Sequence, residues 1–371
     1  MRVAVNTRLL IKNKLDGIGR FSLEILKRIT KNNPNVEFHF IFDRPFDQDF
    51  IFENNVVPHI LKPQTRHPIL WYIWLELQLP KLLKDIKPDV FFSPDGFTSK
   101  KNLCKSIIVI HDINFEHRPK DLKWAHSIFY RTYFKQYAQL ATSIITVSNF
   151  SKEDIAERYN INRNKIHVVY NGVSGNFHKI SDENKLKIKQ KYTAGKDFFV
   201  FIGTLHKRKN IKNLLLSFNK YRQQGGRFEL VIIGEKKWAD FDTINTYKKL
   251  DFKQNVIFLN RVSESDLPNI LGSAKALCFV SFFEGFGIPI IEAMKCEVPI
   301  ICSNTSALPE VANDSAILVN PDNTEDITKA MFMIENDERL CEDLIYKGKQ
   351  RVCDFNWDDS ANKIWRIIKK V

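Results

Sequence analysis

Glu284 and Glu292 lie eight positions apart, close to two glycines, in a stretch that is predicted to connect a strand to a helix. The apolar run 276–281 predicts a buried strand, and residues 290–295 predict the first turns of a helix. Backbone N–H groups at a helix N-terminus suit a phosphate or sugar hydroxyls, and glycines let the backbone approach such a ligand closely. The residues that would do so are Gly285, Phe286, Gly287 and Ile288. Because carboxylates accept hydrogen bonds from hydroxyl groups, the stretch predicts a nucleotide-sugar site.

The elements that must position this stretch follow a regular alternation of strand and helix signals along the chain. In the first half, strands are expected at 3–6, 37–42, 90–93, 106–111 and 143–148, and helices at 19–30, 73–84 and 125–137. In the second half, strands are expected at 198–203, 228–234, 256–259, 276–281, 299–303 and 316–319, each followed by a segment of helix length. This alternation is typical of doubly wound α/β folds, which bind ligands at the carboxyl ends of parallel strands.

The chain length predicts two domains, because 371 residues exceed the size at which a single hydrophobic core usually keeps growing. A turn-forming stretch at 170–176 has the composition of a hinge. We therefore expect an amino-terminal domain at 1–173 and a carboxy-terminal domain at 174–355. The last segment, 356–371, carries apolar residues at helical spacing and is expected to form a helix that packs back on the first domain.

The net charge of +13 is unevenly distributed. Residues 1–175 contain 26 Lys and Arg against 17 Asp and Glu, whereas residues 176–371 contain 30 against 26. A basic surface can bind nucleic acid, an anionic membrane face or an anionic substrate. Since no nucleic-acid-binding motif accompanies the charge, we expect no nucleic-acid partner and favour the other two.

The cellular compartment is expected to be the cytoplasm. The chain opens with a strand pattern rather than a secretory signal, and no apolar run reaches membrane-spanning length. Six scattered cysteines form no CxxC pair, which favours reduced thiols in a cytosolic protein.

A set of short motifs stands at the ends of the predicted elements. They are Gly17-Ile18-Gly19-Arg20, His111-Asp112, Thr146-Val147-Ser148, Asn171-Gly172-Val173, Gly203-Thr204 leading to Arg208-Lys209-Asn210, Val262-Ser263 and Glu284 to Glu292. Because these motifs occur in this order and with this spacing, the chain resembles family 4 of the retaining glycosyltransferases over nearly its whole length. The resemblance implies the GT-B architecture, in which two facing Rossmann-like, doubly wound domains enclose a cleft.

The resemblance implies that Arg208 and Lys209 hold the diphosphate of a nucleotide-sugar donor, as catalytic residues. Breaking the glycosidic bond places extra negative charge on the leaving phosphate, so fixed cations and N–H donors are the main requirement. Arginine can fork across two phosphate oxygens, while lysine acts as a point charge. Gly203 and Thr204 are assigned to the same donor site. The alternative is that residues 207–209 form a solvated basic loop.

The resemblance gives the two glutamates different tasks. Glu292 is expected to hold the ribose hydroxyls, and Glu284 to lie near the donor sugar as a catalytic residue. The N–H groups that follow Glu284 would touch sugar hydroxyls and the distal phosphate. Val262 and its neighbours would contact the base through backbone groups. The alternative for Glu292 is a carboxylate favoured by the helix dipole alone.

In the first domain, the resemblance implies that Gly17 and Gly19 let a loop close over the distal phosphate, with Arg20 at the opening of the next helix. It places His111 near the donor sugar as a catalytic residue, with Asp112 beside it in the donor site. The residues alone leave two alternatives open. A Gly-x-Gly sequence is a common turn, and a solitary histidine often has a structural role.

The implied chemistry is a front-face substitution with retention, in which the departing phosphate helps to deprotonate the acceptor hydroxyl. No metal ion and no cofactor are expected, because no Asp-x-Asp motif stands at a suitable strand end and cations take the place of the metal. The Gly-Thr-Leu-x-x-Arg-Lys-Asn sequence at 203–210 resembles mannosyltransferases of surface-polysaccharide assembly. GDP-mannose is therefore the first expected donor, a UDP-hexose the second, and a glycan or lipid-linked glycan the expected acceptor.

Two other functions remain open from the sequence. A nucleotide-sugar epimerase of the same architecture would need acid and base residues at the sugar but no acceptor groove. A catalytically silent subunit would bind the nucleotide sugar or a partner transferase without turnover. The cationic pair facing two carboxylates argues against the silent subunit, because a purely structural partner would not need it.

Two segments, 67–84 and 118–135, mix aromatic and basic residues. Such segments can lie at the interface of an anionic membrane, which would suit a lipid-linked acceptor on the inner face of the plasma membrane. The alternative is that most of these aromatic side chains belong to the core, because their spacing also fits buried helix faces.

Overall fold

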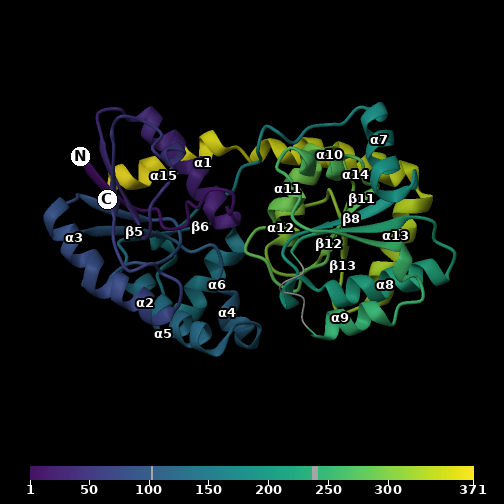
Figure 1. Ribbon diagram of the computed structural model, residues 1–371, viewed down its shortest axis with the longest axis horizontal. Helices are drawn as coiled ribbons and strands as arrows, with labels where there is room; N and C mark the ends of the chain where they lie inside the picture. The colour runs from purple at the N-terminus through teal and green to yellow at the C-terminus, as the bar shows by residue number, and fades with distance from the viewer. Residues whose placement is uncertain (102, 236–240) are drawn as a thin grey trace. The chain divides into compact units, whose positions relative to one another are not determined.

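The computed structural model describes residues 1–101, 103–235 and 241–371. The chain forms two compact units, which we describe separately (Figure 1). Unit 1 comprises Met1–Asn171 and Asn356–Val371, and unit 2 comprises Gly172–Phe355. The C-terminal segment therefore belongs to the same unit as the N-terminus.

Unit 1 is built around a parallel sheet. Its strands are β1 (Arg2–Asn6), β2 (Glu37–Phe42), β3 (Val56–Ile60), β4 (Val90–Ser93), β5 (Lys105–Val109), β6 (Ser143–Thr146) and β7 (Ile166–Val168). The described residues form seven strands in the order β3-β2-β1-β4-β5-β6-β7. Its helices are α1 (Gly17–Asn32), α2 (Pro68–Tyr72), α3 (Leu79–Ile86), α4 (Asn114–His117), α5 (Trp124–Leu140), α6 (Asn149–Tyr159) and α15 (Trp357–Lys370). Short 3₁₀ turns lie at Gln48–Phe50, Pro119–Asp121 and Arg163–Lys165.

Unit 2 repeats this plan. Its strands are β8 (Phe198–Ile202), β9 (Glu229–Ile233), β10 (Val256–Leu259), β11 (Ala276–Phe279), β12 (Ile300–Ser303) and β13 (Ile317–Val319). Within the described ranges they form a six-stranded parallel sheet in the order β10-β9-β8-β11-β12-β13. Its helices are α7 (Asp182–Thr193), α8 (Ile211–Gln223), α9 (Phe241–Lys248), α10 (Asp266–Gly272), α11 (Ile288–Lys295), α12 (Leu308–Ala312), α13 (Thr324–Asn336) and α14 (Glu338–Arg351). Short 3₁₀ turns lie at Lys207–Lys209, Lys253–Asn255 and Val352–Asp354.

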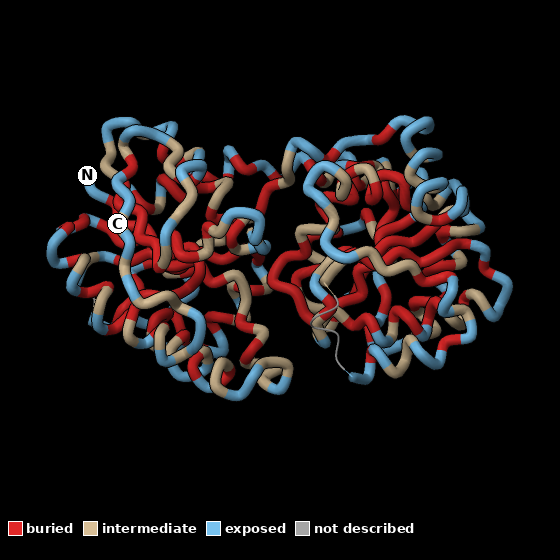
Figure 2. Tube along the Cα trace, viewed as in Figure 1, coloured by how far each residue is buried: buried red, intermediate tan, exposed pale blue. Residues whose placement is uncertain are grey.

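The cores of both units lie on the two faces of these sheets. Every residue of β8, β9 and β11 is buried, as are those of β4 and β6 (Figure 2). Parallel sheets covered by helices on both faces require such continuous apolar strands. The expectation of a doubly wound α/β fold is therefore confirmed.

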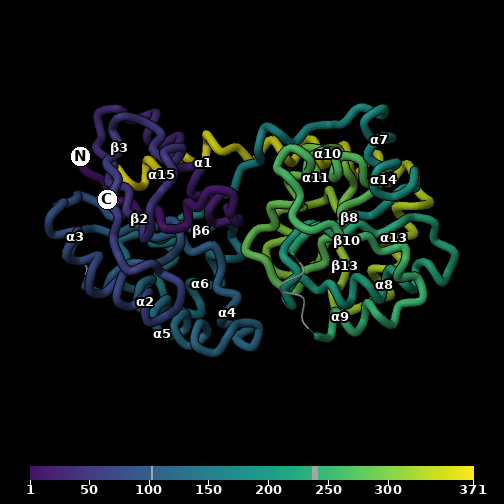
Figure 3. Tube along the Cα trace, in the orientation of Figure 1, coloured from purple at the N-terminus to yellow at the C-terminus, as the bar shows by residue number. Residues whose placement is uncertain are grey.

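Helix α15 packs against α1, so the end of the chain covers the first helix (Figure 3). The ring of Trp357 lies 6.0 Å from that of Phe21, and Arg28 Nε donates to Asp358 Oδ1 at 2.7 Å. Ile364 is fully buried at the centre of the helix. The apolar spacing of this segment thus forms one buried face.

Three local expectations were wrong. Helix α1 begins at Gly17 rather than at the expected residue 19, so the Gly-x-Gly sequence lies in its first turn, because Asp16 caps the helix by accepting from the Gly19 N–H at 2.8 Å. The segment expected as one helix at 73–84 is helical, but its first half, Ile73–Gln78, is a π-helix, and α3 begins at Leu79, one residue before Pro80. Proline lacks an N–H and crowds the carbonyl four residues earlier, which a wider turn relieves.

The third error is the omission of β3 and β7, the two edge strands of unit 1. Strand β3 contains Pro58 and three exposed residues, so its sequence does not alternate as a half-buried strand does. Strand β7 has only three residues. Both form because a neighbouring strand offers backbone partners, which the local sequence does not reveal.

Candidate active site

The loops that follow β8 and β11 meet in unit 2, because these two strands are neighbours in the sheet. Arg208 and Lys209 come from the first loop and Glu284 from the second. Arg208 Nη1 lies 2.8 Å from Glu284 Oε2, and Lys209 Nζ lies 2.6 Å from Glu284 Oε1. Three of the residues expected in the donor site therefore form one ion-pair cluster.

The cluster is held in a buried setting. The Glu284 side chain is 8% exposed and the Lys209 side chain 12% exposed. Burial alone would raise the pKa of Glu284, but Arg208 and Lys209 outweigh that effect and hold its pKa at about 2. Glu284 is thus a permanent carboxylate at neutral pH.

Backbone contacts fix the cationic loop. Asn210 adopts a left-handed conformation with φ 58°, and its side-chain amide donates to the carbonyls of Val280 at 3.0 Å and Pro321 at 2.7 Å. The N–H of Phe282 donates to the Arg208 carbonyl at 2.8 Å. The loop after β8 is therefore tied to the loop after β11 by backbone as well as by charge.

The glycine-containing stretch ends at the N-terminus of α11. Gly287 has φ 101°, and a Cβ on it would lie 2.7 Å from Leu308 Cδ2, so this position requires glycine on both grounds. Gly285, Phe286 and Gly287 are buried, and Ile288 begins the helix. Glu292 lies one turn inside α11 and is 7% exposed. The N-terminus of α11 thus lies four residues after Glu284, and the same helix carries a second buried carboxylate.

The other predicted residues of unit 2 lie at different distances along the sheet edge. Gly203 and Thr204 follow β8 directly, and a Cβ on Gly203 would lie 3.7 Å from Lys209 Cε. They belong to the same loop as the two cations. Val262 follows β10, which is two strands away from β8 in the sheet. The strand order alone does not bring Val262 to the cluster.

In unit 1, His111 lies just beyond β5 and contacts helix α1. Its ring packs edge-on against Phe21, with 4.9 Å between the ring centroids. His111 Nε2 lies 2.9 Å from the Pro94 carbonyl oxygen. Because a carbonyl only accepts, Nε2 carries the proton in this contact. Burial lowers the pKa of His111 despite the Pro94 carbonyl and nearby carboxylates, so the ring is neutral at pH 7.

The remaining predicted residues of unit 1 gather near His111. Asp112 Oδ1 accepts from the backbone N–H of Asn114 at 3.0 Å and from its side-chain amide at 2.6 Å, which caps the short helix α4. Gly17, Gly19 and Arg20 lie in the first turn of α1. A Cβ on Gly19 would lie 3.0 Å from the Leu9 carbonyl oxygen, so glycine allows a close approach of the two segments.

A buried polar network, which was not predicted from the sequence, lies beside these residues. Asn6 is the last residue of β1, Arg8 follows that strand, and Asp95 follows β4. Arg8 Nε donates to Asp95 Oδ2 at 2.6 Å, and Asn6 Nδ2 donates to Asp95 Oδ1 at 2.8 Å. The Arg8 guanidinium also stacks over Phe97, 4.2 Å from the ring centroid. Their positions at strand ends were the signal that could have identified them, since ligand-binding residues occupy such ends.

Two family models match the chain one after the other. The model described as "Glycosyltransferase Family 4" matches residues 15–176, and the model described as "Glycosyl transferases group 1" matches residues 182–351. The chain belongs to glycosyltransferase family 4.

Relatives and solved structures extend this similarity. This family 4 chain is 28% identical over 376 residues to O-antigen chain mannosyltransferase B of Escherichia coli. The matched region covers 97% of each chain. It is 28% identical over 323 residues to O-antigen chain mannosyltransferase RfbU of Salmonella typhimurium strain LT2, covering 84% of this chain and 82% of the relative. Anabaena Alr3699/HepE in complex with UDP and glucose superimposes with a TM-score of 0.77 at 15% identity, covering 100% of each chain. The fold is the GT-B fold of two Rossmann-like domains.

In residues 1–101, 103–235 and 241–371, no group of three or more His, Cys, Asp or Glu side chains is placed to hold a metal ion. Within the same ranges, no helix combines the length and the apolar character needed to cross a membrane.

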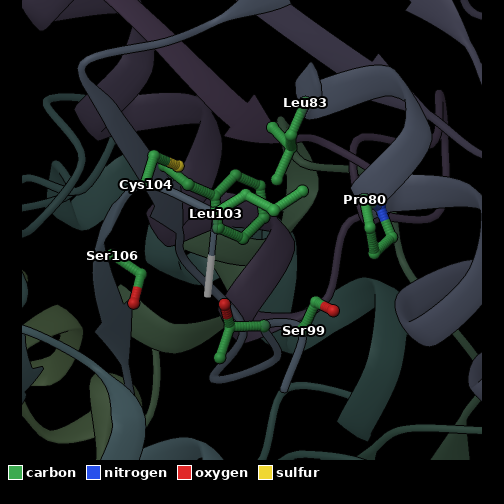
Figure 4. A pocket seen from close by; sticks show the side chains of 8 residues that line it. Pro80, Leu83, Ser99, Leu103, Cys104 and Ser106 are labelled. Carbon is green, nitrogen blue, oxygen red and sulfur yellow. The ribbon is translucent and has the colours of Figure 1, made fainter. Parts of the chain in front are cut away.

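A small cavity lies apart from the clusters above, between α3, β4 and β5. Its lining includes Pro80, Leu83, Ser99, Leu103, Cys104 and Ser106 (Figure 4). Its volume of about 10 Å³ is close to what a single water molecule occupies. Burial also raises the pKa of the Cys104 thiol to about 11, so the thiol is unreactive at neutral pH. This cavity is too small to be a substrate site.

Proposed function

We propose that this glycosyltransferase moves a mannosyl unit from GDP-mannose to a glycan or lipid-linked glycan of a surface polysaccharide, with retention of the anomeric configuration. The observation that carries the proposal is the buried cluster of Arg208, Lys209 and Glu284 beside the N-terminus of α11. The choice of mannose is supported by the two relatives named as mannosyltransferases of O-antigen chains. A UDP-hexose is the second donor candidate.

The cationic pair is assigned to the donor diphosphate. Charge accumulates on the leaving phosphate as the glycosidic bond breaks, and cations fixed in a buried site stabilise that charge more strongly than in water. Arg208 and Lys209 are already held in place by Glu284 and by backbone contacts, so little reorganisation is needed on binding. These cations supply the charge that a metal ion would otherwise supply.

The α11 N-terminus and its carboxylate are assigned to the rest of the donor. The N–H groups of Gly285 to Ile288 would bind the distal phosphate or sugar hydroxyls. Glu292, one turn inside the helix and nearly buried, would accept hydrogen bonds from the ribose hydroxyls. Gly203 and Thr204 would line the phosphates from the loop after β8, and Val262 would lie near the base.

His111 is assigned to the sugar as a neutral hydrogen-bonding group. With Nε2 donating to Pro94, the other ring nitrogen is an acceptor, which suits a sugar hydroxyl better than a phosphate. Gly17, Gly19, Arg20 and Asp112, at the same edge of unit 1, are assigned to the donor as well. The proposed reaction is a front-face substitution in which the leaving phosphate takes the proton of the acceptor hydroxyl, with no cofactor.

The donor assignment is tested by calorimetric titration and thermal shift with GDP, UDP, ADP and their nucleotide sugars. A ligand that binds only the folded state raises the unfolding midpoint. If GDP and GDP-mannose stabilise the protein more than the other ligands do, the proposal is supported. If only UDP-hexoses stabilise it, the donor is a UDP-hexose and not GDP-mannose. Product analysis with and without acceptor, read by the anomeric NMR signals, then tests retention. Conversion of the donor alone would favour an epimerase, and no binding at all would favour a silent subunit.

We also propose that unit 1 contacts the cytoplasmic face of an anionic membrane, where a lipid-linked acceptor would be held. Most aromatic side chains of segments 67–84 and 118–135 are core, including Trp71, Trp74, Phe129 and Phe134. Two apolar residues nevertheless remain exposed on α2, and two more in the first two turns of α5, which contacts α2: Ile69 at 67%, Tyr72 at 40%, Trp124 at 77% and Ile128 at 58%. Each pair is one helical turn apart, so both helices present an apolar surface.

The membrane proposal is tested by co-sedimentation with phosphatidylglycerol vesicles at low salt. The double substitution of Trp124 and Ile128 by serine should reduce binding, because it removes the exposed apolar surface of α5. Serine at Leu186 and Tyr346, which are exposed at 65% and 64% in unit 2, is the matched control. Equal sedimentation of both double variants would contradict the proposed face.

A further inference from the structure

A second hollow lies in unit 1, beside the edge strand β7. It has a volume of about 370 Å³ and is formed by three elements. Helix α6 contributes Asn149 and Lys152, the β7 segment contributes His167, and α15 contributes Lys363 and Arg366. The volume is in the range of small-molecule sites in proteins. It is therefore large enough for a ligand, unlike the cavity beside Cys104.

The hollow has an excess of positive charge. No carboxylate is among its lining residues. In the described part of the chain, Lys152, Lys363 and Arg366 have no ion-pair partner. Burial lowers the pKa of His167, and Lys152 and Lys370 lower it further, with no carboxylate acting in the other direction. Four cationic groups around one histidine thus leave a positive field that the protein itself does not neutralise.

Four of the five acidic residues of α6 and α15 form ion pairs with residues outside the hollow, and the fifth, Asp359, is exposed and does not line it. On α6, Glu153 pairs with Arg163 at 2.6 Å and Asp154 with His117 at 2.7 Å. On α15, Asp358 pairs with Arg28 at 2.7 Å. Lysines that only prevent an edge strand from pairing would stand on the strand itself. Here the cations come from two helices that flank the strand, so they surround a volume rather than protect an edge.

We propose that this hollow is a second anion site, which binds a ligand carrying one or two phosphate groups. Arginine forks across phosphate oxygens, lysines supply point charges, and imidazole and amide groups add hydrogen-bond donors. Asn149 is held for this role by donating to the Tyr170 hydroxyl at 3.1 Å. The site lies wholly in unit 1, whereas Arg208 and Lys209 lie in unit 2, so the proposal does not rest on the proposed donor site.

The test uses the imidazole of His167 as a local reporter in the full-length protein with ¹³C-labelled histidine. Inorganic diphosphate should shift the His167 resonance and raise its pKa, because the anion offsets the field of Lys152 and Lys370. The substitution His167→Gln assigns the resonance. In the double variant Lys363→Glu with Arg366→Glu, the apparent affinity from this resonance should fall about tenfold or more.

The matched control is Lys27→Glu with Lys31→Glu, which makes the same charge change at two exposed lysines of α1. It should respond to diphosphate as the parent protein does. An unchanged His167 resonance in the parent would overturn the proposal. Equal weakening in both double variants would also overturn it, because the effect would then be general charge screening.

Titrations with lipid vesicles, read by the same His167 resonance, identify the source of the phosphate. Phosphatidylglycerol vesicles that shift the His167 resonance, when phosphatidylcholine vesicles do not, would assign the site to a lipid headgroup. A response to diphosphate but to neither vesicle would assign it to a soluble or carrier-linked phosphate. Either result supports the anion site, and a response to none of the three probes overturns it.

Discussion

The Nζ atom of Lys209 lies 2.6 Å from Oε1 of Glu284, although the two residues come from loops that follow different strands. The Glu284 carboxylate forms ion pairs with the same two cations that we assign to the donor diphosphate. It therefore keeps Arg208 and Lys209 in place before the donor binds, and the incoming phosphate oxygens must share these cations with it. A site organised in this way needs little rearrangement during the reaction.

The substitution Lys209→Ala should lower kcat by about 100-fold or more, because it removes one fixed cation from the leaving phosphate. The fold should be retained, since Arg208 still pairs with Glu284. Steady-state kinetics with the donor chosen by titration provides the measurement. Lys207→Ala is the matched control, because Lys207 is an exposed lysine of the same 3₁₀ turn. Equal kcat values for the two variants would remove Lys209 from the site.

The substitution Glu284→Gln should destabilise the protein at neutral pH but not in acid. The pKa of Glu284 is lowered from 4.5 to about 2 in the folded protein. The carboxylate then stabilises the fold by on the order of 3 kcal/mol. That contribution is present above about pH 4.5 and is lost as the pH falls towards 2, because the unfolded chain takes up the proton first.

Urea unfolding of the parent and the Glu284→Gln variant between pH 7 and pH 3 measures this effect. The difference in free energy of unfolding should shrink as the pH falls. Glu342→Gln, at an exposed position on α14, should differ little from the parent at any of these pH values. If the difference in free energy of unfolding between the parent and Glu284→Gln does not change with pH, the charge of Glu284 is not what stabilises the fold.

His111 should remain neutral at pH 6.5, the ordinary pKa of histidine, because burial lowers its pKa. An NMR titration of ¹³C-labelled histidine, assigned with His111→Gln, measures this directly. The exposed His178 provides an internal comparison. Half-protonation of His111 at or above pH 6.5 would contradict the dominant effect of burial on its pKa.

The substitution Ile364→Ala should lower the free energy of unfolding of the protein by about 2–4 kcal/mol, since it leaves a cavity under α15. Ile364 is fully buried. Asn362→Ala, at an exposed position on the same helix, should have a much smaller effect. Similar decreases in the free energy of unfolding for both variants would mean that the buried face of α15 does not contribute more to stability than its exposed face.

The charged site was predictable residue by residue, but its geometry was not. Arg208, Lys209 and Glu284 lie in loops that follow apolar strands, and Glu292 lies in the helix after the second loop. The sequence reveals these places through hydrophobic pattern and glycine placement. That Glu284 bridges both cations depends on β8 and β11 being neighbours, although β9 and β10 separate them in sequence. Strand order is set by tertiary packing and has no local signal.

The same limit applies to the aromatic segments of unit 1. Helical spacing indicated that Trp71 and Trp124 could each face either the core or solvent. Trp71 is 8% exposed because it packs against Phe97 and Phe129, whereas Trp124 is 77% exposed at the first position of α5. By contrast, the capping Asp16 was a readable signal that residues 17–20 begin a helix.

Unit 2 is an insertion within the polypeptide of unit 1, between Asn171 and Asn356. Its two ends meet, since the Val173 N–H donates to the Phe355 carbonyl at 3.3 Å. On the unit 1 side, Ser360 Oγ donates to the Tyr170 carbonyl at 2.7 Å. Residues 172–355 can therefore be excised as a continuous gene fragment. Unit 1 is recovered only when residues 1–171 are fused through a short linker to 356–371, and a simple truncation at residue 171 would strip the buried cover from α1.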